Sequence, residues 1–147
     1  MPATTPTMPR PVIKAVQSKM ADDLVALANP KQPIIIPATV HNDNNLNPFA
    51  RLLYGALLTV TKQTGRPYIT LSDKAIAAHY DRNPYAVNRV IYALVAAGYV
   101  RISNRQSYQT TGKVITTNYY TGHTTGKRRI IWPLLDQYSN PINEERR

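Results

Sequence analysis

Apolar residues recur with the period of a helix in the middle of the chain, first over residues 48–60. They fall at i, i+3, i+4, i+7, i+8 and i+11: Phe49, Leu52, Leu53, Ala56, Leu57 and Val60. This spacing puts an apolar stripe along one side of a helix, and proline suits a first helical position. We therefore predict a long amphipathic helix that begins at Pro48 and ends at Gly65-Arg66-Pro67.

A second helix is expected to start at Ser72, because a serine hydroxyl can accept a hydrogen bond from a free backbone N–H of the first turn. Leu71 and Ile76 supply only a small apolar face, which predicts a short helix. A break follows at Asp81-Arg82. The pattern thus favours two helices with a tight turn between them.

The next helix has its own start and stop signals. Asn83 can cap it, and Pro84 fits its first position, where the missing N–H is not needed. Its apolar residues recur at i, i+4 and i+7: Val87, Ile91 and Leu94. Gly98 is expected to end the helix in a left-handed conformation.

After Gly98 the pattern changes to the period of strands. β-branched and aromatic residues predict strands over residues 99–102, 114–120 and 129–132, separated by turns at residues 110–113 and 121–126. A further small strand is expected at residues 68–70. The predicted class is α+β, with three helices followed by antiparallel strands.

The two ends of the chain differ from its middle. Residues 1–32 are expected to form a flexible, proline-rich arm with a short helix over residues 17–29, which either packs on the domain or pairs two copies. The apolar side predicted for that helix is Met20, Leu24 and Leu27. Residues 33–135 form the predicted domain, which opens with an extended segment over residues 33–37, and residues 136–147 form a tail with little to bury beyond its anchors Leu134 and Leu135.

Charge narrows the choice of partner. The net charge is +10, and residues 99–132 contribute six basic side chains and no acid. Such a concentration favours a polyanion. The absence of cysteine excludes disulfides, thiolate catalysis and zinc fingers, and fits a reducing cytoplasm. No run approaches the roughly 18 apolar residues of a membrane span, so we expect a soluble cytoplasmic protein with no membrane partner.

Three short motifs stand out within residues 34–102: A-R-L-L-Y-G at Ala50–Gly55, I-A at Ile76–Ala77 and L-x-x-x-G-Y-V at Leu94–Val100. With the order helix, turn, helix, strand, they make the chain resemble the winged helix-turn-helix domain of plasmid and phage replication initiators and replisome organisers. The resemblance implies a three-helix core with an enlarged antiparallel β-wing. It also implies binding to double-stranded DNA in replication, transfer or transcription control, with a homodimer on a repeated or palindromic site as one arrangement.

In such a domain the last helix of the motif enters the major groove with its N-terminal half leading. The expected contacts from its outer face are Asn83, Tyr85, Asn88, Arg89 and Tyr92. Arg89 can pair bidentately with guanine and Asn88 with adenine, while Tyr85 can meet a phosphate or a thymine methyl group. Lys74 and Arg82 are expected to hold phosphates. The alternative is that these residues form only the solvated face of an amphipathic helix.

The wing adds a second set of expected DNA contacts: Arg101, Arg105, Lys113, Lys127, Arg128 and Arg129. Neighbouring strand positions face opposite sides, so at least one of Arg128 and Arg129 is expected to face solvent. Tyr108, Tyr119 and Tyr120 suggest base stacking, although tyrosines in strands more often fill a sheet face.

Catalytic readings find no support in the sequence. The three histidines lie far apart, no glycine-rich loop precedes a lysine and a serine, and the eight acids form no paired set. We expect no enzymatic activity, cofactor, metal or small-molecule substrate. The alternatives to duplex DNA binding are a winged-helix module for protein interaction and a binder of single strands or RNA that uses the tyrosine-rich wing.

Overall fold

The protein is a mixture of helices and a small antiparallel sheet. A computed structural model describes residues 20–110, 113–119 and 129–142, with the backbone alone at residues 104–110 and 113–119. In chain order the elements are a helix over residues 20–28, α2 (Ala38–His41), α3 (Pro48–Thr64), α4 (Asp73–Tyr80), α5 (Pro84–Ala96), β1 (Val100–Thr110), β2 (Lys113–Tyr119) and β3 (Arg129–Pro133). The predicted α+β class is confirmed.

Polar side chains cap the starts of α3, α4 and α5; the caps Ser72 and Asn83 are as predicted, whereas a cap at Asn47 was not predicted. Each accepts a backbone N–H of the first turn: Asn47 Oδ1 from Ala50 at 2.8 Å, Ser72 Oγ from Ala75 at 3.1 Å, and Asn83 Oδ1 from Tyr85 at 2.7 Å. Such caps satisfy N–H groups that have no partner within the helix. The caps are local, which explains why the sequence predicts these starts well.

Glycine ends two of these helices. Gly65, with φ 75°, follows α3, and Gly98, with φ 84°, follows α5. Beyond α5 the Tyr99 N–H donates to the Leu94 carbonyl and the Gly98 N–H to the Val95 carbonyl, each at 3.0 Å. This pair of bonds is a Schellman motif, which closes the helix and turns the chain directly into β1.

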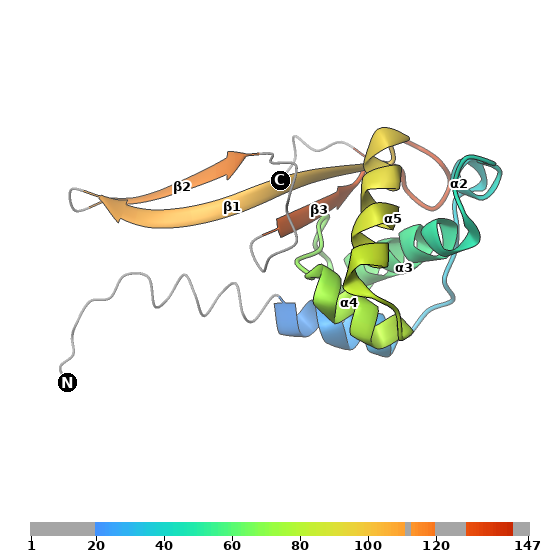
Figure 1. Ribbon diagram of the computed structural model, residues 1–147, viewed down its shortest axis with the longest axis horizontal. Coiled ribbons are helices and arrows are strands. Elements are labelled where there is room, and N and C mark those ends of the chain that lie inside the picture. The colour runs from blue at the N-terminus through green and yellow to red at the C-terminus, as the bar shows by residue number, and fades with distance from the viewer. Residues whose placement is uncertain (1–19, 111–112, 120–128, 143–147) are drawn as a thin grey trace.

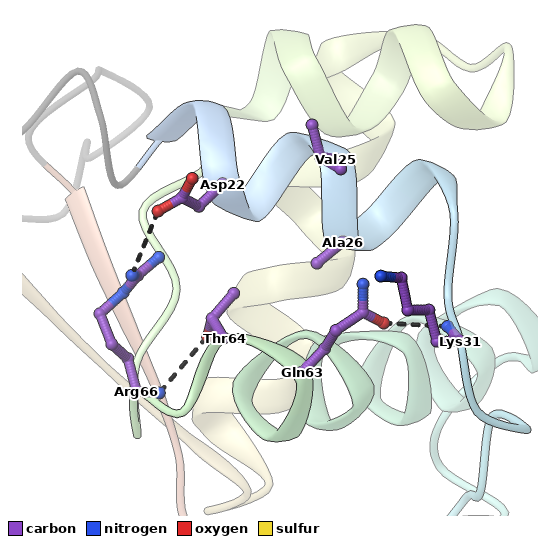
Figure 2. Close-up of a pocket in the computed structure, with 7 residues that line it drawn as sticks. All are labelled: Asp22, Val25, Ala26, Lys31, Gln63, Thr64 and Arg66. Atoms are coloured by element: carbon purple, nitrogen blue, oxygen red, sulfur yellow. Dashed lines mark hydrogen bonds and ion pairs between the residues drawn. The ribbon is translucent and has the colours of Figure 1, made fainter.

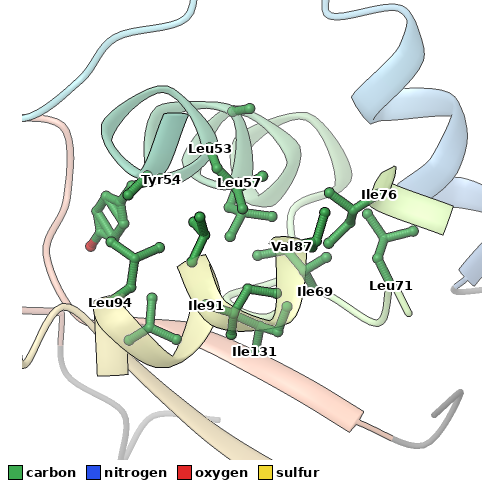
Figure 3. Close-up of a cluster of buried hydrophobic side chains, with 14 of the residues drawn as sticks. Leu53, Tyr54, Leu57, Ile69, Leu71, Ile76, Val87, Ile91, Leu94 and Ile131 are labelled. Carbon is green, nitrogen blue, oxygen red and sulfur yellow. The ribbon is translucent and has the colours of Figure 1, made fainter. Parts of the chain in front are cut away.

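The core lies where α3, α4, α5 and the start of the sheet converge (Figure 3). Its fully buried side chains include Leu53, Tyr54, Leu57, Ile69, Leu71, Ile76, Val87, Ile91, Leu94 and Ile131. The predicted apolar faces of α4 and α5 are confirmed, and that of α3 is confirmed except at Leu52, which is 40% exposed. Ile69 also forms an isolated antiparallel bridge with Ile131. This single bridge is found where a small strand over residues 68–70 was predicted.

The sheet has the order β2-β1-β3, and both pairings are antiparallel. Val100 to Asn104 pair with β3, and Asn104 to Thr110 pair with β2. β1 is therefore much longer than the predicted residues 99–102. Figure 1 shows the β1–β2 hairpin extending away from the helices, while β3 stays beside them. The predicted turns lie at least partly outside the described residues.

The helix over residues 20–28 packs on the domain, but not with the predicted face. Leu27 is buried as predicted, whereas Leu24 is 38% exposed and Asp23 is fully buried. The Asp23 carboxylate accepts the Thr70 N–H at 2.7 Å, the Thr70 hydroxyl at 3.0 Å and Arg66 Nη2 at 2.7 Å. Because Thr70 and Arg66 supply these donors, Asp23 lies on the inner face of the helix and Leu24 lies toward solvent. Residues before 20, predicted to be a flexible arm, lie outside the described residues.

The extended segment predicted between Pro33 and Pro37 lies against α3 at Gly55. A Cβ atom at Gly55 would come within 2.9 Å of Ile36 Cγ1 and 3.2 Å of the Ile35 carbonyl oxygen. Only glycine gives this close approach without displacing the segment. The short helix α2 follows the segment and was not predicted, because its four residues carry no side-chain cap.

The C-terminal segment stays packed further than predicted. Tyr54 Oη donates to the Leu135 carbonyl at 2.8 Å and accepts the Leu135 N–H at 2.9 Å, so Leu135 is an anchor as expected. Beyond it, a turn brings the Ile142 N–H to the Leu134 carbonyl at 2.8 Å. The prediction of a tail from residue 136 is thus wrong for residues 136–142.

Candidate nucleic-acid interface

The two helices α4 and α5 are joined by a tight turn of residues 81–83. Asp81 adopts φ 54°, a left-handed conformation that aspartate tolerates better than most residues, and the Arg82 N–H donates to the Ala77 carbonyl at 2.9 Å. Asn83 then caps α5, and Pro84 occupies its first position. The end of α4 is therefore set by Asp81, and the start of α5 by Asn83 and Pro84.

The outer face of α5 presents an arginine and a tyrosine. Arg89 is exposed, and Tyr85 is 70% exposed, an unusual degree for a large aromatic side chain. Asn83 is exposed at the start of the helix, and Tyr92 is half-buried one turn after Asn88. The core-facing side of the same helix is filled with aliphatic residues. This arrangement leaves the N-terminal half of α5 accessible along one face.

Asn88 is held from within the protein. It is half-buried, and its Nδ2 donates to Asp73 Oδ2 at 2.9 Å. The contact joins the middle of α5 to the first residue of α4 and gives the Asn88 amide one orientation. The predicted pairing of Asn88 with adenine would have to use the amide in this orientation.

Two further predicted contacts flank α5. Lys74 is exposed in the first turn of α4. Arg82 is exposed in the turn, and its guanidinium lies 4.1 Å from the centre of the Phe49 ring. A guanidinium stacked on an aromatic face keeps its donors free at its edge. Both residues are therefore exposed cations, as the predicted phosphate contacts require.

The predicted wing contacts other than Arg129 divide into three groups. Arg101 is exposed at the start of β1. Arg105 and Lys113 belong to the β1–β2 hairpin, at the register pairs Arg105–Asn118 and Thr110–Lys113, and only their backbone is described. Lys127 and Arg128 lie outside the described residues, and no tyrosine of the hairpin has a described side chain.

Arg129 corrects the sequence prediction. Its side chain is fully buried rather than exposed, so it is not available to a DNA backbone in this structure. Nη1 forms an ion pair with Asp73, and Nη2 donates to the Leu71 carbonyl at 2.5 Å. Burial lowers the pKa of Arg129, and the neighbouring Asp73 carboxylate offsets part of this effect.

Asp73 is the residue of this site that sequence reasoning missed. It is buried, yet it accepts from both Arg129 and Asn88. The only local signal is an acid directly after the cap Ser72, which is common for electrostatic reasons at any helix start. Both of its partners are distant in sequence, so no local pattern identifies them.

A shallow pocket of about 370 Å³ lies between the helix over residues 20–28 and the C-terminal end of α3 (Figure 2). Its lining residues are Asp22, Val25, Ala26, Lys31, Gln63, Thr64 and Arg66. Charges of both signs line it, and Arg66 is directed to Asp22 and Asp23. The pocket therefore defines neither an anion site nor a cation site.

Comparison with known proteins identifies no relative: no protein family model, curated protein or solved structure matches this chain. Within the described residues, no helix is long and apolar enough to cross a membrane. The same part of the chain contains no group of three or more histidine, cysteine or acidic side chains that could hold a metal ion.

Proposed function

We propose that this protein binds double-stranded DNA as a winged helix, with α5 in the major groove and the β1–β2 hairpin as the wing. One observation carries the proposal: the capped pair α4–α5 presents an exposed arginine and tyrosine on the free face of α5, directly before a long hairpin. The major groove of B-DNA is about 12 Å wide and admits an α-helix. The 13 residues of α5 extend about 20 Å.

The exposed charges support a polyanionic ligand. Lys74, Arg82, Arg89 and Arg101 are all exposed within residues 72–103, whereas Asp81 is the one exposed acid of that segment. A surface with this excess attracts DNA through counterion release and steers its approach. Lys74 and Arg82 would hold phosphates, while Arg89 and Tyr85 would meet base edges.

The cellular role follows from the resemblance of residues 34–102 to initiator domains. We propose that the chain acts in plasmid or phage replication, transfer or transcription control, in the cytoplasm and without catalysis. A homodimer would read a repeated or palindromic site, because half-site spacing mirrors the symmetry of the protein.

A binding assay tests the proposal against its alternatives. The wild-type protein should bind a random-sequence duplex at low salt, weaken steeply as salt rises, and prefer duplex over single strand in competition. Failure to bind any duplex at low salt would favour a protein-interaction module. Stronger competition by single strands or RNA would favour the hairpin as a stacking surface.

Two substitutions that each remove one positive charge sharpen the test. On a preferred site selected from random duplexes, Arg89→Ala should cost about 1–3 kcal/mol and relax preference at one base position. Lys62→Ala, on the exposed C-terminal turn of α3, serves as the control and should leave preference unchanged. Equal losses on all sequences would make Arg89 a phosphate contact.

A further inference from the structure

A buried ion pair connects the sheet to both helices of the proposed DNA-binding unit. Arg129 is the first residue of β3, Asp73 is the first residue of α4, and Asn88 lies in the middle of α5. The Asp73 carboxylate accepts Arg129 on one oxygen and Asn88 on the other, while Arg129 also donates to the Leu71 carbonyl. One carboxylate thus links β3, α4 and α5.

Arg129 lies at the root of the hairpin, which we define as the register position of Asn104. On one side Asn104 faces Arg129 of β3, and on the other it faces Tyr119 of β2. β1 therefore changes partner here, and its remaining residues continue into the hairpin that extends away from the helices (Figure 1). Anchoring Arg129 fixes the direction in which the hairpin leaves the body.

The length of the hairpin makes that direction matter. From Asn104 to Thr110 the strand advances about 20 Å, at about 3.4 Å for each residue. A rotation of about 10° at the root would displace the hairpin tip by about 3.5 Å, which is about the rise along the DNA axis from one phosphate of a strand to the next. A loose root would therefore let the hairpin contact DNA in more than one register.

Stability alone explains this ion pair poorly. Burying two charges has a large desolvation cost, and apolar replacements of such pairs are often neutral or stabilising. The guanidinium instead fixes the relative positions of the groups it binds, because its planar, rigid set of N–H donors reaches two acceptors at once. Here the two acceptors are the Leu71 carbonyl, two residues before α4, and the carboxylate of Asp73, the first residue of α4.

We propose that Arg129 is a positioning residue that sets the angle between the hairpin and α5 and, through Asp73, the orientation of Asn88. Its effect is on discrimination between DNA sequences rather than on attraction to DNA. The inference rests on the proposed function in that its ligand is duplex DNA, but the angle itself is a property of the free protein.

The test is the double variant Asp73→Asn/Arg129→Met. It removes the buried ion pair without changing the net charge, and asparagine at position 73 can still accept from Asn88. The matched control is Asp22→Asn/Lys62→Met, an equally charge-neutral change at two exposed positions. Arg129→Lys is a milder variant, because lysine keeps the charge but loses the fork that reaches both acceptors.

The first measurement needs no DNA. Because the chain has no cysteine, Ala93→Cys and Gln109→Cys place spin labels on α5 and near the hairpin tip with no competing thiol. The label–label distance distribution should be narrow with the wild-type pair and with the control, broad with the double variant, and intermediate with Arg129→Lys. An unchanged distribution in Arg129→Lys and in the folded double variant would overturn the proposal.

The second measurement compares a preferred duplex, selected with the wild-type protein, with a random-sequence duplex. The double variant should keep its affinity for the random duplex and its salt slope, and lose about tenfold or more of its preference, the cost of a misplaced base contact. Full preference alongside a broadened distance distribution would overturn the role in discrimination. If the wild-type protein binds no duplex, the proposed function fails, and the label distances still decide whether Arg129 sets the angle.

Discussion

Removal of the Asp23 carboxylate should destabilise the protein far more than removal of its neighbour Asp22. Asp23 is fully buried and accepts two hydrogen bonds from Thr70 and one from Arg66. Asp22 forms an ion pair with Arg66 at 3.6 Å, and its side chain is 59% exposed. The two acids are adjacent in one helix, so each is the natural control for the other.

The expected loss of unfolding free energy depends on which buried partners each alanine substitution leaves unpaired. Removing one partner of a buried ion pair costs about 3–5 kcal/mol, because the other partners stay buried without it. The Arg66 side chain is 20% exposed and still near Asp22, which favours the lower end, about 3 kcal/mol for Asp23→Ala. Asp22→Ala removes an exposed pair and should cost about 0–1 kcal/mol. Any gain in helix propensity is common to both variants.

Thermal and urea unfolding followed by circular dichroism measure the difference. For a chain of this length, about 3 kcal/mol corresponds to a fall in Tm of about 6–12 °C. Hydrogen exchange adds a local reading, since the Thr70 amide should lose protection in Asp23→Ala and keep it in Asp22→Ala. Equal losses of stability in the two variants, or a protected Thr70 amide in Asp23→Ala, would refute this account of the buried acid.

Three further perturbations test the core and its anchors. Leu94→Ala should cost about 2–5 kcal/mol in urea unfolding, because it opens a cavity between α3 and α5, and an unchanged free energy would contradict the packing. Gly55→Ala should cost about 1–3 kcal/mol, since the new Cβ meets Ile36 and the Ile35 backbone; full stability would mean that the segment is free to move. Burial raises the pKa of Tyr54 to about 12 from 10.0, so the stability it contributes is intact below pH 10 and lost as pH rises through 12. Tyr54→Phe should lack this loss of stability at alkaline pH. If the difference in free energy of unfolding between Tyr54→Phe and the wild type stayed constant from pH 10 to about 12, the raised pKa of Tyr54 would be excluded.

The sequence predicts most of the elements because their signals are local. The caps Ser72 and Asn83 act within three residues, and the left-handed residue Gly98 follows directly from the need to turn the chain after α5. The periodic apolar faces of α4 and α5 are equally local. These features could be located without knowledge of the rest of the fold.

The errors occur where a polar residue finds a partner far along the chain. Asp23 is 47 residues from Thr70, and Arg129 is 56 residues from Asp73. In a sequence pattern an acid in a helix and an arginine in a basic segment both read as exposed, because charged residues are rarely fully buried unless paired. The sequence pattern therefore places Arg129 on the predicted DNA-binding surface, and it places Leu24 rather than Asp23 on the inner face of the helix over residues 20–28. Nothing in the local pattern distinguishes these two charged residues from their exposed neighbours.

Asp23 and Asp73 are both buried, and both are bonded at one short segment, residues 70–73, which leads into α4 and includes its first residue. Asp23 accepts from Thr70, and Asp73 accepts from Arg129, whose guanidinium also reaches the Leu71 carbonyl. Each acid is paired with one arginine, so both pairs are neutral and the net charge of +10 remains on the other residues. Acids on the surface of α4 or α5 would instead repel a polyanion. Buried and paired beside this segment, the two carboxylates add no negative charge to the surface that we propose as the DNA interface.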